Sequence, residues 1–231
     1  AKIGWNSAKL KEALDYAGKN KSSGVVILYR GRILAEQYWP LNPKEKTAAD
    51  QPNPYFHMRF GKNAKGRAIE DVASLQKSVT AMLVGIAQHK GLLKITDPVH
   101  KHLGKGWSKA SATAEAKITI RHLITMSSGL NPRLQYVAPA GTEWFYNTGA
   151  YSIALTCVSK AAKMDAGQLT KKWLTEPLGM KYSRWALRPR QKSMRTYANR
   201  YGFATTARDL ARFGLLMLAD GNWGKKNVIE D

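Results

Sequence analysis

The sequence has a single cysteine, Cys157, among its 231 residues, and this excludes a disulfide bond within the chain. Cys157 lies in an apolar helical pattern, which favours a buried and unreactive thiol. No run of eighteen apolar residues occurs, so we expect no membrane span. The first residues do not follow the pattern of a signal peptide. We expect a periplasmic or secreted location, with the cytoplasm as the alternative.

Acidic residues are scarce, because 16 Asp and Glu stand against 37 Lys and Arg, for a formal net charge of +21. Such an excess favours anionic partners in general. However, the basic residues are scattered, and no helix-turn-helix, zinc-finger or aromatic-interleaved pattern accompanies them. We therefore predict a solvated basic surface with no specific nucleic-acid partner.

Patterns typical of metal and nucleotide sites are also absent. Two of the five histidines, His100 and His102, stand two apart in a predicted turn, and we interpret them as solvated loop residues. No Walker or dinucleotide-binding glycine pattern occurs, nor does the G-x-S-x-G motif of α/β-hydrolases. The sequence therefore predicts no metal site and no cofactor.

What the sequence does contain is a globular composition, with 44% hydrophobic residues. Apolar periodicity and turn residues predict a helix over 7–19 capped by Ser7, a hairpin over 24–39 around Gly31-Arg32, a loop over 40–68, and helices over 74–90, 117–130, 150–163, 167–175 and 205–223. A single hairpin does not form a stable sheet alone. Strands are therefore missing from this prediction.

The segment "SLQKS" over 74–78 places Ser74 and Lys77 three residues apart at the start of a predicted helix. That spacing puts both side chains on one helix face. A lysine in apolar surroundings can give up its proton and then accept one from a serine, which makes the serine a nucleophile. Spacing alone favours an ordinary N-cap serine and a solvated lysine. The apolar residues around Lys77 favour the catalytic interpretation.

A second candidate segment is "PAGTEWFYNTGAYSI" over 139–153, where Gly141 and Gly149 enclose an aromatic run. A tyrosine on such a loop can present its phenol to a serine, and a nearby lysine favours its deprotonated form. The alternative is an aromatic cluster packed in the core.

Five ordered segments together resemble the superfamily of serine β-lactamases and penicillin-binding proteins, in particular its class C-like branch of esterases, peptidases and amide hydrolases. They are "SLQKS" (74–78), "ITIRHLITMSSGL" (118–130), "PAGTEWFYNTGAY" (139–151), "EPLGM" (176–180) and "GFATTARDLARFGLLML" (202–218). The resemblance covers about residues 20 to 228. It implies an α+β fold of the α/β sandwich type, with an antiparallel sheet flanked by helices and an all-helical region.

The resemblance implies that Ser74 is the acylated nucleophile, Lys77 its activating partner, and Tyr146 a general base or proton shuttle. The backbone N–H of Ser74 would form half of the oxyanion hole. Where the family more often has Asn, two residues after the tyrosine, this sequence has Thr148. The substrate-orienting role therefore falls on Asn147 or Thr148, and Trp144 is a further candidate for substrate binding.

The family also has a Lys- or His-x-Gly motif on a late strand, and the sequence shows no counterpart after residue 218. We therefore expect an incomplete copy of the fold that lacks C-terminal strands. The expected division is an α/β region over 1–70 and 202–231 and a mainly helical region over 71–201. One apolar face of the hairpin and of helix 205–218 should then be exposed, and this favours self-association or a complementing C-terminal segment.

The sequence thus predicts a serine hydrolase that acts on a carboxylic ester, a linear amide or a β-lactam through an acyl-enzyme. The alternative belongs to a different class: a catalytically silent binding or scaffold protein that keeps the helical part of the fold.

Overall fold

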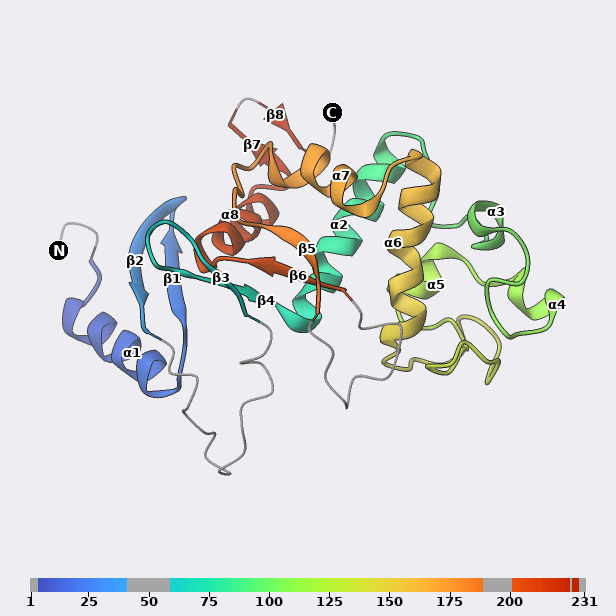
Figure 1. The fold of residues 1–231 in the computed structure, drawn as a ribbon, viewed down its shortest axis with the longest axis horizontal. Helices are drawn as coiled ribbons and strands as arrows, with labels where there is room; N and C mark the ends of the chain where they lie inside the picture. The colour runs from blue at the N-terminus through green and yellow to red at the C-terminus, as the bar shows by residue number, and fades with distance from the viewer. Residues whose placement is uncertain (1–3, 41–58, 189–200, 225, 229–231) are drawn as a thin grey trace.

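The computed structural model describes residues 4–40, 59–188, 201–224 and 226–228. Figure 1 shows their arrangement: the N-terminal helix and hairpin lie at one end, a small sheet lies in the middle, and most helices lie at the other end.

The N-terminal end consists of α1 (Ser7–Lys19) and the antiparallel pair β1 (Gly24–Tyr29) and β2 (Arg32–Tyr38). The predicted helix and hairpin are confirmed. The helix cap is Asn6 and not the predicted Ser7, because the Asn6 side chain accepts the Lys9 N–H at 3.0 Å. The hairpin turn falls on Arg30 and Gly31, which both have positive φ, as the tightest right-twisted hairpins require.

A four-stranded antiparallel sheet lies in the middle of the molecule, in the order β3-β4-β6-β5 (Figure 1). Its strands are β3 (Arg59–Lys62), β4 (Ala68–Asp71), β5 (Arg184–Leu187) and β6 (Tyr201–Thr205). These are strands that the sequence prediction lacked. β3 lies in the segment predicted as loop, over 40–68, and 41–58 of that segment lie outside the described residues. The predicted α+β class is confirmed.

The helices surround a core centred on α2 and α6. They are α2 (Gln76–His89), α3 (His100–Leu103), α4 (Ala112–Glu115), α5 (Ile120–Ile124), α6 (Thr148–Ala162), α7 (Ala166–Thr170) with a π-helical turn at Lys171–Thr175, and α8 (Ala207–Leu218). Cys157 is buried in α6, and this burial raises the pKa of its thiol to about 12. The prediction of an unreactive buried thiol is consistent with that environment.

The helix predicted over 117–130 is much shorter in the structure, at five residues. Its predicted cap is correct: the Thr119 side chain accepts the His122 N–H at 3.3 Å, and His122 Nδ1 accepts the Thr119 N–H at 3.2 Å. Residues 126 and 129 then adopt positive φ, which ends the helix and starts the loop that leads to Tyr146.

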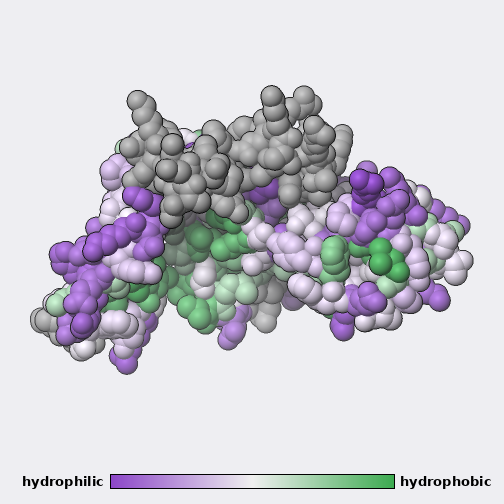
Figure 2. Space-filling model, turned by 90° about the horizontal axis from the view of Figure 1, so that it is seen from below, coloured by the Kyte–Doolittle hydropathy of each residue, from purple (hydrophilic) through white to green (hydrophobic). Residues whose placement is uncertain are grey.

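The hairpin is only partly covered by the described residues. α8 packs against β1, yet no residue of β1 or β2 is fully buried. On α8, Met217 and Leu218 are exposed. Figure 2 shows a hydrophobic area on the lower face, between the N-terminal end and the helical part. The predicted self-association through these surfaces stays a prediction. The division into an α/β region and a helical region also stays a prediction, although β5 falls within the range 71–201 that was assigned to the helical region.

Leu83 lies in the middle of α2 and has no exposed surface. Replacing Leu83 with Ala should lower the free energy of unfolding by about 2–5 kcal/mol, because the cavity cannot collapse fully. Urea denaturation measures the loss. Leu92, which is more than one-third exposed, provides the matched control, and Leu92→Ala should cost less than about 1 kcal/mol.

Candidate active site

The turn that carries Ser74 joins the sheet to the central helix. β4 ends at Asp71, a single 3₁₀ turn covers Ala73–Leu75, and α2 begins at Gln76. Ala73 has φ of 47°, a left-handed conformation that is uncommon for alanine. Ser74 is therefore presented at the start of a helix, and its side chain is exposed.

The simple interpretation of Ser74 as a helix cap does not match the structure. No side-chain capping hydrogen bond occurs at the start of the 3₁₀ turn or of α2. Instead, Ser74 Oγ lies 2.6 Å from Tyr146 Oη, and Lys77 Nζ donates to Ser74 Oγ at 3.3 Å. The sequence prediction that these three residues meet agrees with these distances.

Lys77 lies between the serine and two aromatic rings. Its Nζ also donates to Tyr146 Oη at 3.0 Å, and it lies 4.9 Å from the Tyr146 ring centroid and 5.9 Å from that of Tyr151. Both rings attract a cation through their negative faces. The Tyr151 hydroxyl donates to the Lys77 carbonyl at 2.8 Å, which ties the first turn of α2 to α6. These contacts hold the Lys77 side chain between Ser74 and the two tyrosine rings.

The electrostatics of Tyr146 follow from the same contacts. The hydrogen bond from Lys77 lowers the pKa of the Tyr146 phenol below its ordinary value of 10, and hydrogen bonds with Ser74 and Thr148 act in the same direction. Partial burial opposes this change but does not outweigh it. Because a phenolate is a strong acceptor, Tyr146 can take the Ser74 proton across the 2.6 Å contact.

The loop before α6 brings Tyr146 to this position. The Phe145 N–H donates to the Met126 carbonyl at 2.9 Å, and the Gly141 N–H donates to the Ser127 carbonyl at 2.7 Å. Gly141 has φ of 88°, and a Cβ there would lie 3.2 Å from His122 Nε2. The glycine thus permits both the turn and the close approach of the histidine.

The three candidates for substrate binding occupy different environments. Asn147 is buried, and its side chain accepts the Ala150 N–H at 3.1 Å and donates to the Leu130 carbonyl at 2.7 Å. Its amide therefore caps α6 and faces the interior. Thr148 is the first residue of α6, and its side chain helps to lower the pKa of the Tyr146 phenol. Trp144 is 70% exposed, and its ring centroid lies 6.5 Å from that of Tyr146.

A cavity of about 1060 Å³ adjoins the site. It reaches Lys77 and Thr148 and runs along α6, past Ser152, to Trp185 and Tyr201 of the sheet. Such a volume is sufficient for a small organic molecule.

The described residues contain no group of three or more His, Cys, Asp or Glu side chains arranged to hold a metal ion. Nor do they include a helix that is long and apolar enough to cross a membrane. The interpretation of His102 as a solvated loop residue is wrong, because its side chain is 8% exposed and its Nε2 lies 3.1 Å from Asp97 Oδ2. Asp97 and His102 are five residues apart, and no pattern in the sequence marks the two side chains as a pair.

Asp97 makes the stability of this region depend on pH. Burial raises the pKa of its carboxyl, but hydrogen bonds from Lys101, the Lys94 N–H and His102 outweigh burial and lower the pKa from 3.8 to about 2. The stabilisation is therefore complete above about pH 4 and is lost as pH falls through about 2. Urea midpoints measured between pH 5 and pH 2 should fall less steeply for Asp97→Asn than for the wild type. Equal slopes would contradict this expectation.

The small antiparallel sheet, the helical region and the serine at the start of a central helix together define a protein of the penicillin-binding-protein-like, beta-lactamase fold. The chain belongs to the Beta-lactamase family, whose model matches residues 10–229. An uncharacterised protein from Alkalihalophilus pseudofirmus is 24% identical over 246 residues, which cover 97% of this chain and 65% of that protein.

Solved structures support the same fold. A Bacteroides dorei protein provisionally described as a beta-lactamase superposes with a TM-score of 0.69 at 20% identity, covering 97% of this chain and 66% of that one. A Bacillus anthracis protein provisionally described as a 6-aminohexanoate-dimer hydrolase gives 0.68 at 17% identity, covering 95% of this chain and 59% of that one. The chain thus spans less than two thirds of the length of each of these relatives.

Proposed function

We propose that this protein is a serine hydrolase that cleaves a carboxylic ester or amide through an acyl-enzyme at Ser74. One observation carries the proposal: Ser74 Oγ is 2.6 Å from Tyr146 Oη, and Lys77 Nζ donates to both oxygens. A nucleophile, a proton acceptor and a cation that stabilises the acceptor's charged form are therefore within hydrogen-bond distance of one another.

In the proposed reaction, the Tyr146 phenolate takes the proton from Ser74 Oγ as this oxygen attacks the substrate carbonyl carbon. Lys77 stays protonated and stabilises the phenolate and the developing negative charge. The tetrahedral intermediate collapses when the bond to the leaving alcohol or amine breaks, and the Tyr146 phenol donates its proton to that group. A water molecule, deprotonated by Tyr146, then attacks the carbonyl carbon of the Ser74 ester. The bond to Ser74 Oγ breaks, Tyr146 returns the proton to this oxygen, and the acid is released.

We assign the remaining roles from their surroundings. The Ser74 N–H is one donor to the oxyanion, at the positive end of α2. Thr148 has the substrate-orienting role, because it lines the cavity and its side chain helps to lower the pKa of Tyr146. The Asn147 amide, in contrast, donates a hydrogen bond to the Leu130 carbonyl in the interior. Trp144 offers an exposed aromatic surface next to Tyr146.

For the substrate, we favour a small ester or linear amide, as in the esterase and amide-hydrolase members of the class C-like branch. The description of the Bacillus anthracis structure as a 6-aminohexanoate-dimer hydrolase is in line with this choice, because that dimer is a linear amide. β-Lactams remain a second substrate class for the same acylation chemistry.

The proposal is tested by covalent labelling. The chain is incubated with a fluorophosphonate or a fluorescent penicillin, and intact-mass and peptide mass spectrometry locate the added mass. We expect one adduct on the peptide that contains Ser74. A folded chain that acquires no adduct from either reagent would favour the alternative of a silent binding or scaffold protein.

A further inference from the structure

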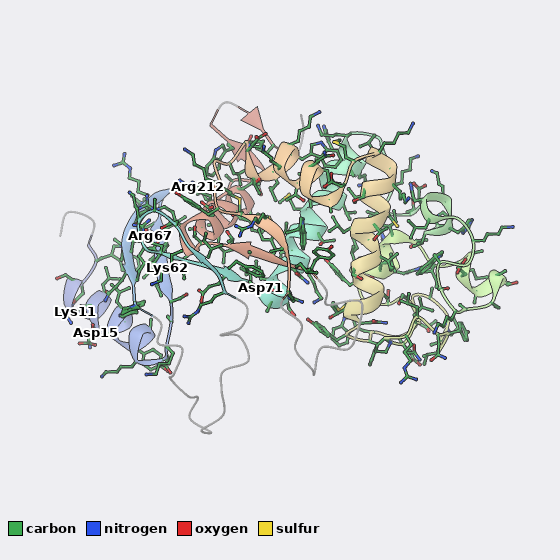
Figure 3. The ribbon with its side chains drawn as sticks, viewed as in Figure 1. Lys11, Asp15, Lys62, Arg67, Asp71 and Arg212 are labelled. Carbon is green, nitrogen blue, oxygen red and sulfur yellow. The ribbon has the colours of Figure 1, made fainter. Side chains whose placement is uncertain are left out.

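A buried ion pair lies under the turn that carries Ser74. Asp71 is the last residue of β4, and its side chain has no exposed surface; Arg188 directly follows β5, and its side chain is 6% exposed. Arg188 donates from Nε to Asp71 Oδ2 at 2.5 Å and from Nη2 to Oδ1 at 3.0 Å. Figure 3 labels Asp71 where β4 meets the start of α2. This two-bond geometry is the one that holds a buried pair most firmly.

The same carboxylate holds the turn itself. Asp71 Oδ1 accepts the Ala73 N–H at 2.7 Å, which fixes the peptide that enters the left-handed conformation at Ala73. L residues adopt that conformation rarely, so the surroundings must impose it. Because Ser74 is the next residue, the direction of its side chain depends on this peptide.

Strand β6 holds the Ser74 turn through hydrogen bonds to Phe203. The Val72 N–H donates to the Phe203 carbonyl at 3.0 Å, and the Phe203 N–H donates to Gln76 Oε1 at 3.2 Å. The chain is thus attached to one buried residue both before and after Ser74. At Gly202, a Cβ would lie 1.9 Å from Asp71 Oδ2, so only glycine leaves room for the carboxylate.

We propose that Asp71, Arg188 and Gly202 form a positioning clamp that sets the Ser74 turn and thereby the distances from Ser74 Oγ to Tyr146 and Lys77. This inference rests on the proposed function of Ser74. None of the three touches the Ser74, Lys77 or Tyr146 side chains in the described contacts; they act through the backbone. Displacing a nucleophile by about 1 Å can cost on the order of a hundredfold in rate.

The first test uses two glycines that differ in their surroundings. Gly202→Ala adds a methyl group against Asp71, whereas Gly214→Ala on α8 adds the same group where no atom lies within 4 Å. We measure the second-order rate at which a fluorophosphonate labels Ser74, as a function of pH. Gly202→Ala should lower the plateau rate about tenfold or more and move the pH midpoint upward, because a displaced Ser74 lowers the pKa of Tyr146 less. Gly214→Ala should match the wild type.

The second test removes the charges one at a time and together. Asp71→Asn and Arg188→Met each remove one side of the buried ion pair, so both should slow labelling. Asp71→Asn/Arg188→Met removes both charges of the pair and keeps an acceptor for the Ala73 N–H. The double variant should therefore label faster than Arg188→Met alone. Arg188→Lys, which keeps the charge, should label at a rate between those of Arg188→Met and the wild type.

A third variant separates positioning from general loss of stability. Asp209 is another buried carboxylate, bound to the Tyr182 N–H and to Arg212. Asp209→Asn should lower the urea midpoint and leave the labelling rate unchanged. If Asp209→Asn slows labelling as much as Arg188→Met does, the proposed positioning role is wrong. It is also wrong if folded Gly202→Ala and Arg188→Met are labelled at the wild-type rate. A folded wild type that is not labelled overturns the proposed function itself.

Discussion

Replacing Ser74 with alanine should abolish covalent labelling and lower the hydrolysis of a small activated ester by at least about a thousandfold. Removal of a nucleophile leaves only binding and charge stabilisation, which contribute far less than the covalent route. The loss should appear in kcat, because Ser74 is exposed at the end of a turn and its truncation disturbs no packed neighbour. Initial rates over a range of substrate concentrations measure it.

Ser78 provides the matched control for this substitution. It is also an exposed serine near the start of α2, one turn beyond Ser74. Ser78→Ala should keep the wild-type rate and the wild-type adduct. Equal activity of the two variants would show that Ser74 is not the nucleophile.

Replacing Tyr146 with phenylalanine should lower the acylation rate by about a hundredfold to ten-thousandfold, because the proton acceptor is removed. The aromatic ring is kept, so the contact with Trp144 should survive. Tyr136, an exposed tyrosine of the same region, supplies the control: Tyr136→Phe should leave the rate unchanged.

The dependence of the acylation rate on pH should follow the protonation of Tyr146. The base is the deprotonated phenol, so acylation should increase as pH rises through the pKa of Tyr146, which lies below 10. Lys77→Met removes the largest cause of that lowering, and the midpoint should move toward higher pH. A midpoint that stays in place, or that moves to lower pH, would contradict the role assigned to Tyr146.

Part of this site could be predicted from the sequence, by local spacing taken together with the resemblance to serine β-lactamases and penicillin-binding proteins. Three residues along a helix place Ser74 and Lys77 on one face, and glycines around an aromatic run predict an exposed loop with Tyr146. The role of Asn147 as a helix cap could also be predicted from the neighbouring residues. An Asn three residues before a helical N–H is a common cap, and this pattern distinguishes it from Thr148.

The sheet and the ion pair could not be predicted in this way. β3 and β4 are four residues each and contain charged side chains, so neither shows a clear alternation of apolar and polar residues. Their partners are distant: Glu70 pairs with Thr205 in β6. Asp71 and Arg188 are likewise 117 positions apart in the sequence, and nothing in the neighbouring residues of either indicates the other.

The contact between Gly202 and Asp71 also makes the substitutions tolerated at position 202 depend on the residue at position 71. As long as an aspartate occupies position 71, substitutions at 202 meet its carboxylate and should be removed by selection. Once position 71 carries a smaller residue, the same substitutions become acceptable. In a library that varies both positions, Gly202 should therefore look as restricted as Ser74 in one background and tolerant in the other, even though no substrate contacts it.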